Sequence, residues 1–170
     1  MSMISERYEF ANGYIGLANL DLKNLPKLIE VEGDTLLLKS EHHISLMCVK
    51  RVVELIEVED KEALQLQIVD DFERFIGKQA LTEFSLLPEF RMVERDERKS
   101  IVVMTSVSGL EDFFNVVRNK YHALEIPMQP THITLYTLQP EAGIGIFSDA
   151  ELRSDSHVIE LAALERIVRA

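Results

Sequence analysis

The sequence predicts an antiparallel α+β fold, and three observations lead to this class. Two long stretches, residues 60–76 and 110–124, repeat apolar side chains at helical spacing. Many shorter stretches have the composition of strands, and the connections between them are short. Such an order of elements is typical of antiparallel sheets backed by helices. With 170 residues, the chain is expected to form a single domain, residues 1–170, with a sizeable core.

Composition indicates a soluble globular chain, with 46% hydrophobic and 28% charged residues. The single cysteine, Cys48, excludes an internal disulfide framework and a multi-cysteine metal site. Glu6, Arg7 and Glu9 interrupt the start, so we expect no signal peptide. No stretch approaches the length of a membrane helix, and we expect no membrane partner. A reducing cytoplasm is the compartment that fits these observations.

The formal net charge of −11 restricts the possible ligands. A protein that neutralises many phosphates needs a basic surface, because each contact replaces counterions of the nucleic acid. The only dense group of Lys and Arg lies in the turn-like segment 94–99. Long duplex or structured RNA is therefore excluded as the main ligand, whereas a small nucleotide or a short RNA end remains compatible.

The first third of the chain predicts three strands. Residues 1–12 are polar and mixed, so we expect an irregular start. Strands are predicted at residues 14–20, 35–39 and 42–49, with a turn at 32–34 before the second of them.

A helix is predicted at residues 60–76, with Asp60 as its N-cap and Gly77 as its stop. Its apolar face carries Leu64, Ile68, Phe72, Phe75 and Ile76. The preceding residues 52–58 are apolar with interspersed charges, and a short helix and a loop both fit them.

The middle of the chain predicts strands and a hairpin. Residues 84–87 have strand composition, and Pro88 is expected to end that strand. Residues 90–95 and 100–107 form a predicted hairpin around the turn 96–99, and β-branched residues in its second strand favour partial burial.

The second helix begins at a capping-box pattern, Ser108 to Glu111. Its apolar stripe consists of Leu110, Phe113, Phe114, Val117, Tyr121 and Leu124. Pro127 and Pro130 end this segment, and a strand is predicted directly afterwards at residues 131–138.

The C-terminal region gives weaker signals. Residues 143–147 favour a strand in which two glycines permit close backbone approach, and 151–153 favour a helical turn. Residues 158–161 and 164–168 are strand candidates, and a short helix from Ala162 onward fits equally well.

Two of the predicted strands carry the same pattern of a histidine, an apolar residue and a hydroxyl residue. Because side chains alternate along a strand, His43, Ser45 and Met47 are expected on one face, with Cys48 on the opposite core face as an inert buried thiol. A histidine and a hydroxyl two residues apart are separated by about 6.6 Å along a strand, so one phosphoryl group can span them.

The second copy of the pattern predicts that His132, Thr134 and Tyr136 share a face. Histidine suits proton transfer near neutral pH because its pKa of about 6.5 lets it accept and donate protons. Two imidazoles around one phosphorus provide a base for the attacking water and an acid for the leaving alkoxide. Ser45 and Thr134 would then donate hydrogen bonds to the phosphate oxygens.

With these two His-x-Ser/Thr motifs, the chain resembles the two-histidine (2H) phosphoesterase superfamily, also called LigT-like or cyclic phosphodiesterase-like. The resemblance rests on the two motifs and on the order of elements along most of the chain. It implies two lobes related by a pseudo-twofold axis, each a small antiparallel sheet backed by helices, with one motif from each lobe in a central cleft. The first motif has Ser45 where threonine is frequent in the family, which retains the donating hydroxyl.

The resulting hypothesis is a metal-independent phosphoesterase without a cofactor. Its catalytic residues are His43 and His132, and Ser45, Thr134 and Tyr136 are its substrate-binding residues. It would hydrolyse a 2′,3′-cyclic phosphate, or a related cyclic or 2′,5′ linkage, of a nucleotide or short RNA end, as in RNA end processing. The sequence does not assign which histidine is the base.

Other readings of the same residues remain open at this stage. The same fold could bind a phosphorylated nucleotide without turnover, or the histidines could be incidental to an interaction domain. Tyr136 fits stacking on a base or ribose as well as packing at a sheet edge. His42 is expected to point away from His43, which makes a metal pair poor geometry, while His122 and His157 are expected at the surface.

Overall fold

The computed structural model describes residues 2–3, 7–79 and 83–166, and it has the predicted α+β class. The strands are β1 (Ser2–Met3), β2 (Tyr8–Ala11), β3 (Tyr14–Leu17), β4 (Leu28–Val31), β5 (Asp34–Leu38), β6 (Ile44–Cys48), β7 (Phe84–Arg95), β8 (Arg98–Val107), β9 (Thr131–Thr137) and β10 (Ser156–Ile159). The helices are α1 (Val49–Val52), η1 (Val53–Leu55), α2 (Lys61–Lys78), α3 (Leu110–Lys120), α4 (Asp149–Asp155) and η2 (Ala162–Leu164). None of the described helices is long and apolar enough to cross a membrane.

The strands of the described residues form one ten-stranded sheet in the order β1-β2-β3-β6-β9-β8-β7-β10. The β4–β5 hairpin joins it through β5, which pairs with β9. All the pairings between the described strands are antiparallel. The two strands that carry the histidine motifs, β6 and β9, are therefore neighbours in the middle of the sheet.

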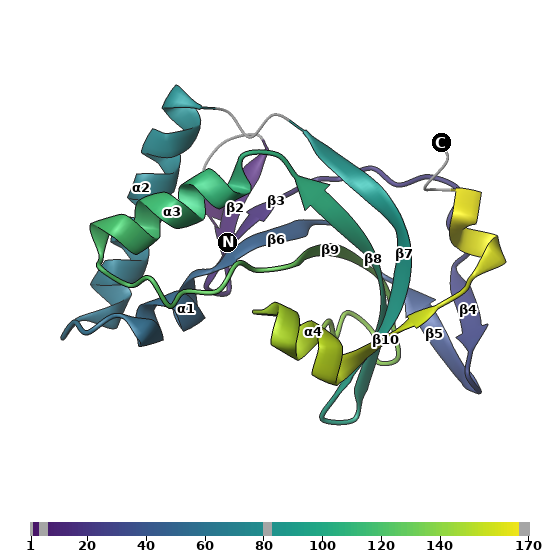
Figure 1. The fold of residues 1–170 in the computed structure, drawn as a ribbon. Helices are drawn as coiled ribbons and strands as arrows, with labels where there is room; N and C mark the ends of the chain where they lie inside the picture. Colours follow the sequence, from purple (N-terminus) through teal and green to yellow (C-terminus); the bar gives the residue numbers. More distant parts are fainter. Residues whose placement is uncertain (1, 4–6, 80–82, 167–170) are drawn as a thin grey trace.

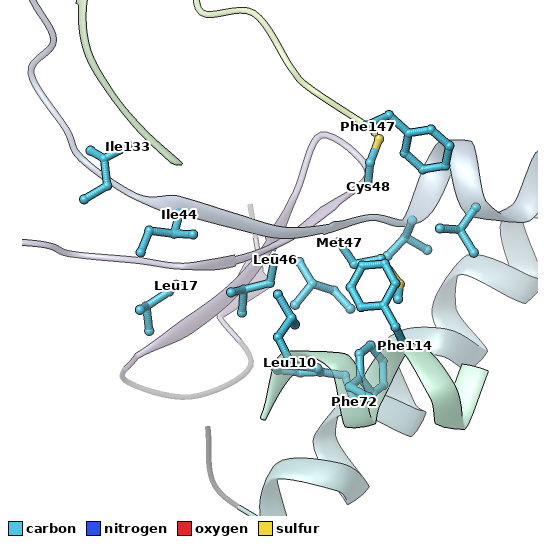
Figure 2. Packing of buried hydrophobic residues seen from close by; sticks show 14 of the residues in the cluster. Leu17, Ile44, Leu46, Met47, Cys48, Phe72, Leu110, Phe114, Ile133 and Phe147 are labelled. Atoms are coloured by element: carbon cyan, nitrogen blue, oxygen red, sulfur yellow. The ribbon is translucent and has the colours of Figure 1, made fainter. Parts of the chain in front are cut away.

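Helices α2 and α3 lie side by side and cover one face of this sheet (Figure 1). Their aromatic side chains form the centre of the main core, where the rings of Phe72 and Phe113 meet edge to face at 5.0 Å. Leu46, Met47 and Phe114 pack in the same cluster (Figure 2). The motif strands are thus anchored from behind by a fully buried hydrophobic layer.

A second, smaller cluster lies on the opposite face of the sheet. Val102 and Met104 of β8 pack there against Ile144 and Ile146 of the segment that follows β9. Leu152 of α4 packs against this cluster, and α4 lies on the other side of the sheet from α3 (Figure 1). The loop after β9 is thereby held over the face that α2 and α3 leave free.

The predicted helix at 60–76 is α2, and its capping is confirmed. The Asp60 carboxylate accepts a hydrogen bond from the amide of Ala63 at 3.0 Å. The expected stop at Gly77 is wrong, because α2 continues to Lys78 and Gly77 lies within the helix with open space around its Cα. Glycine ends a helix only where the backbone turns left-handed, and Gly77 does not.

The second predicted helix is α3, but its start differs from the prediction. Gly109 is the N-cap, with φ of 86°, and no side chain caps the helix. The predicted capping box is therefore wrong: the N-cap lies one residue after Ser108, and Ser108 does not cap the helix. Helix α3 ends at Lys120, so Leu124, predicted in its stripe, lies beyond it and is exposed.

The irregular start predicted for residues 1–12 is wrong for residues 8–11, which form β2. Asn12 and Gly13, with φ of 53° and 80°, join β2 to β3 through a two-residue turn. Positive φ at both positions defines a type I′ turn, for which Asn-Gly is the strongest sequence signal. The predicted turn at 32–34 is confirmed, with positive φ at Glu32 and Gly33.

The hairpin predicted around residues 96–99 is confirmed as β7–β8, turning at Asp96 and Glu97. Pro88 does not end a strand, because β7 runs through it with a register shift between Leu86 and Phe90. A proline without an amide hydrogen is tolerated where the ladder is interrupted.

Near the C-terminus, the predicted helical turn at 151–153 lies in α4, and the strand candidate at 158–161 overlaps β10. The strand predicted at 143–147 is wrong, since these residues form a loop. From Ala162 the chain is helical rather than extended as far as Arg166, and the rest of the 164–168 candidate lies outside the described residues. Helices α1 and η1 occupy residues 49–55, which favours the short-helix alternative for the start of 52–58.

Candidate functional site

The first motif strand, β6, contains a β-bulge directly after Ser45. Ser45 pairs with Gly16 of β3, whereas Met47 pairs with Ile15, so Leu46 is an extra residue in β6. A bulge of this kind shifts the alternation of side chains beyond it. Leu46 and Met47 accordingly both point toward the helices, and Cys48 points to the opposite side, toward Phe147 (Figure 2).

The second motif strand, β9, has the same irregularity at the equivalent position. Thr134 pairs with Val102 of β8 and Tyr136 pairs with Ile101, so Leu135 is the extra residue. Tyr136 is thereby turned to the face away from Thr134. Each motif therefore presents its histidine and hydroxyl residue on one face and then changes face.

The two motifs meet at the pair Ile44–Ile133, where β6 and β9 run antiparallel. Continuing this register by one residue each way sets His43 opposite Thr134 and Ser45 opposite His132. Opposite side chains in such a pair have Cβ atoms about 4.5–5.5 Å apart. The four polar side chains therefore form a compact quartet around a local twofold axis.

This quartet lines a pocket of about 310 Å³ on the sheet face opposite α2 and α3. The pocket is lined by Glu9, Ala11, Asn12, Tyr14, Gly16, Lys39, Glu41, His43, Ser45, His132, Thr134, Gly143, Ile144 and Gly145. The four residues that the sequence places in one cleft, His43, Ser45, His132 and Thr134, all line this pocket. Its volume is at the lower end for a small-molecule site.

Three sequence-based placements are corrected by the bulges. Tyr136 is fully buried, and its hydroxyl donates to the carbonyl of Pro26 at 2.7 Å, so it does not line the pocket. Met47 lies in the main core instead of the cleft. Cys48 is buried, as expected, but on the opposite side of the sheet from the helices, next to Tyr14.

His132 is the most buried member of the quartet, with 7% of its surface exposed. Its Nδ1 is buried and has no hydrogen-bond partner among the described residues. Burial, together with the nearby His43 and Lys39, lowers the pKa of His132 to about 4. The imidazole is therefore neutral at neutral pH, with one ring nitrogen able to accept a proton.

His43 is only partly buried, and its surroundings have opposite effects on its pKa. Burial, followed by the charge of Lys39, lowers the pKa of His43, while the carboxylate of Glu41 raises it. His43 thus differs from His132 in that the pocket is more open at its position and includes a carboxylate that opposes the lowering of its pKa.

Lys39 is the cation of the pocket, and sequence analysis did not single it out. It follows β5, and its backbone amide donates to the carbonyl of Leu135, the extra residue of β9, at 2.9 Å. A Cβ built on Gly143 would lie 3.9 Å from both the Lys39 ammonium and the Thr134 hydroxyl, which places these groups together. A phosphate would therefore meet a positive charge beside the two hydroxyl donors.

The bulge of β6 is held by a buried side chain, that of Gln129. Its amide nitrogen donates to the carbonyl of Ser45 at 3.0 Å, and its oxygen accepts from the amide of Cys48 at 2.8 Å. These are backbone groups on either side of the extra residue Leu46, which the interrupted ladder would leave unpaired. Gln129 is thus a positioning residue for Ser45 that carried no signal in the sequence.

The loop after β9 forms one wall of the pocket. Arg95 donates to the carbonyl of Gly145 at 2.7 Å, and Arg98 donates to that of Gly143 at 3.3 Å. A Cβ on Gly145 would lie 2.5 Å from the hydroxyl oxygen of Tyr14, so only glycine fits this approach. The predicted close approach is thus found at Gly145, where a tyrosine side chain meets a loop, and not at Gly143, whose neighbours lie at ordinary contact distance.

The remaining histidines lie outside the quartet. His42 does not line the pocket, in agreement with its predicted orientation away from His43. His157 contacts Glu32 at 2.7 Å on the surface, and His122 is also exposed. Among the described residues, no group of three or more histidine, cysteine and acidic side chains has metal-binding geometry.

Comparisons of this chain with protein-family models, with curated proteins and with solved structures find no match. The function must therefore be argued from the pocket itself.

Proposed function

We propose that this protein is a phosphoesterase that hydrolyses a 2′,3′-cyclic phosphate, or a related cyclic or 2′,5′ phosphodiester, by two-histidine acid–base catalysis without a metal. The observation that carries the proposal is the single pocket lined by His43, Ser45, His132 and Thr134, which are contributed by two strands remote in sequence. Three further observations, the buried neutral imidazole, the adjacent lysine and the small volume, fit an anionic substrate with one phosphorus.

The sheet also supports the expected two-lobed arrangement of a 2H phosphoesterase. The motif strands β6 and β9 are central, with β3, β2 and β1 on one side and β8, β7 and β10 on the other. The matched bulges after Ser45 and Thr134 extend this internal symmetry to the backbone. We therefore propose that the chain is related to the 2H phosphoesterases, on the basis of the same two motifs that support the proposed function.

In the reaction that we propose, His132 is the general base and His43 the general acid. Neutral His132 accepts a proton from the water whose oxygen attacks phosphorus. The bond between phosphorus and one ribose oxygen breaks, and protonated His43 donates its proton to that oxygen. The assignment rests on geometry: His132 is buried, whereas His43 is only partly buried and has the carboxylate of Glu41 nearby, which opposes the lowering of its pKa by burial and by Lys39.

Ser45 and Thr134 would stabilise the charge that builds on the non-bridging oxygens. Each hydroxyl can donate one hydrogen bond, and both are fixed on strands before the substrate arrives. The Lys39 ammonium adds a positive charge beside them. Since the net charge of the chain is −11, this local cation is needed to attract an anion to the pocket.

The decisive experiment compares wild type with His43→Ala and His132→Ala on 2′,3′-cyclic nucleotides in excess chelator. Each substitution should lower kcat/KM by about 10² to 10⁴-fold, because it removes one proton-transfer group. The double variant should be little worse than either single variant, since the two residues act in one step. Circular dichroism checks that the variants fold. Equal turnover by wild type and both variants would refute the assignment, as would a rate that vanishes in chelator.

A nucleotide-binding module on the same fold is the second candidate. It is favoured by burial, which lowers the pKa of both imidazoles and so disfavours the protonated form that a general acid needs. Binding of a nucleoside monophosphate without turnover of any cyclic nucleotide would select this function. For either function we retain the cytoplasm as the expected compartment.

A further inference from the structure

A row of paired residues leads from the quartet across the sheet to a carboxylate. Ser45 of β6 pairs with Gly16 of β3, and Gly16 pairs with Glu9 of β2. Directly paired residues present their side chains on the same face of a sheet. Neighbouring strands are about 4.8 Å apart, so Glu9 stands roughly 10 Å from the strand of Ser45, on the same face.

Because Gly16 has no side chain, the backbone between Ser45 and Glu9 is uncovered and forms the floor of the pocket. A Cβ at this position would lie 3.3 Å from the carbonyl of Ile44 and 3.8 Å from a carboxylate oxygen of Glu9. The Glu9 side chain therefore reaches back over the glycine toward the quartet. All three residues of the row line the same pocket, so its floor is a flat strip with a hydroxyl at one end and a carboxylate at the other.

The two ends of the pocket differ in charge. Lys39 and the two imidazoles surround the hydroxyls, whereas Glu9 lies at the far end of the strip, and the charge of Glu41 acts on both Glu9 and His43. Neither carboxylate has a hydrogen-bond or ion-pair partner within the described ranges 7–79 and 83–166. Burial, and then the charge of Glu41, raises the pKa of Glu9, which is the condition that a hydrogen-bond donor from a ligand would relieve.

The unpartnered nitrogen of His132 is a second, independent indication that this pocket receives a polar ligand. His132 is more than nine-tenths buried, and its Nδ1 has no partner among the described residues although the ring lines the cavity. Buried polar atoms are almost always hydrogen-bonded in native proteins. A ligand that spans the floor would contact the quartet at one end and the Glu9 carboxylate at the other.

We propose that the acidic end of the pocket selects guanine, whose Watson–Crick edge presents two adjacent N–H donors, as the base of the nucleotide substrate. This inference rests on the proposed function, since the phosphate must occupy the quartet for the base to reach Glu9. The distance of roughly 10 Å between the two ends suits a phosphate and the far edge of a purine.

The chemistry of the other bases explains the choice. An ionised carboxylate only accepts hydrogen bonds, and the N1–H and N2–H groups of guanine donate to its two oxygens in parallel. Adenine and cytosine each place an acceptor beside their amino donor. Uracil has one donor between two carbonyl oxygens, which a carboxylate repels. A site built for paired donors rejects ligands that leave its buried acceptors unpaired.

The test measures affinity, so it does not depend on turnover. Isothermal titration of the full chain with guanosine 3′-monophosphate and uridine 3′-monophosphate at neutral pH should give a preference for guanosine of at least about tenfold. Glu9→Gln should bring the two affinities to within about threefold, because the amide replaces one acceptor by a donor. Glu73→Gln, the same change on an exposed position of α2, should keep the wild-type preference.

Each outcome separates this inference from the proposed function. Equal affinities in wild type, or an unchanged preference in Glu9→Gln, would overturn the guanine assignment even if cyclic nucleotides are hydrolysed through the histidines. A guanosine preference lost in Glu9→Gln, without any hydrolysis, would support the base site and overturn catalysis. No binding of either nucleotide would overturn both. If Glu9→Gln does not fold, Glu9→Asp keeps the charge, withdraws the carboxylate by one methylene and should likewise reduce the preference for guanosine.

Discussion

The strands β6 and β9 carry the same motif and the same bulge, yet their surroundings differ. In β6 the bulge is held by the side chain of Gln129, and His43 beside it is only partly buried. In β9, which pairs with β5 and β8, the extra residue Leu135 accepts a hydrogen bond from the backbone amide of Lys39. His132 of this strand is buried. A symmetric arrangement of chemical groups can therefore acquire unequal acid–base properties through unequal burial and neighbouring charges.

The sharpest difference between the two strands should appear in the pH dependence of stability. The pKa of His132 is about 4 in the folded chain and about 6.5 in an unfolded one. Between these values the unfolded chain binds a proton that the folded chain does not, so stability falls as pH drops through this window. We expect His132 to cost roughly 3 kcal/mol of the free energy of unfolding between neutral pH and pH about 4.

Urea unfolding across this pH range measures the effect. His132→Gln should remove that part of the slope, whereas His43→Gln should remove less, because His43 is more open and has Glu41 beside it. Identical pH profiles for wild type and His132→Gln would contradict the unequal burial of the two imidazoles.

The next prediction concerns the support of the β6 bulge. Gln129→Leu leaves the Ser45 carbonyl and the Cys48 amide without partners, and should lower the free energy of unfolding by roughly 2–3 kcal/mol. Since Ser45 is displaced rather than removed, kcat should fall more than binding does. Gln129→Glu keeps the acceptor for Cys48 but sets a second oxygen against the Ser45 carbonyl, so it should be destabilising as well, and most so where the buried carboxylate is ionised. Equal stability of all three proteins in urea unfolding would mean that the bulge needs no such support.

The smallest effects are expected from the two hydroxyls. Ser45→Ala and Thr134→Val should each lower kcat/KM on a cyclic nucleotide by about tenfold or more, through loss of one fixed donor. Thr134→Ser keeps the hydroxyl and should stay close to wild type. If Thr134→Ser is as impaired as Thr134→Val, the methyl group and not the donor is what matters at that position.

Sequence periodicity was sufficient for helix α2 and for the shared faces of the quartet. Asp60 and the apolar face of 60–76 predicted α2, and the two-residue spacing of His43 with Ser45 and of His132 with Thr134 predicted which side chains share a face. These features depend on interactions within one segment. The Asn12–Gly13 turn is also a local signal, because Asn-Gly by itself predicts a two-residue hairpin turn.

The residues beyond each hydroxyl could not be placed from the sequence. Met47 and Tyr136 were assigned to the cleft by strict alternation, and both were displaced by bulges. The β6 bulge depends on Gln129, and the β9 bulge on Lys39, which are distant in sequence from the strands they support. Tertiary hydrogen bonds therefore decided the faces that periodicity alone had assigned wrongly.

The guanidinium of Arg95 joins three parts of the chain that are otherwise separate. Its nitrogens contact the carbonyl of Gly145 and the carboxylates of Glu151 and Asp155, so β7, the pocket loop and α4 share one anchor. Any ligand that displaces the loop must also strain the docking of α4. The position of the pocket wall and the docking of α4 are thus coupled through a single side chain on β7.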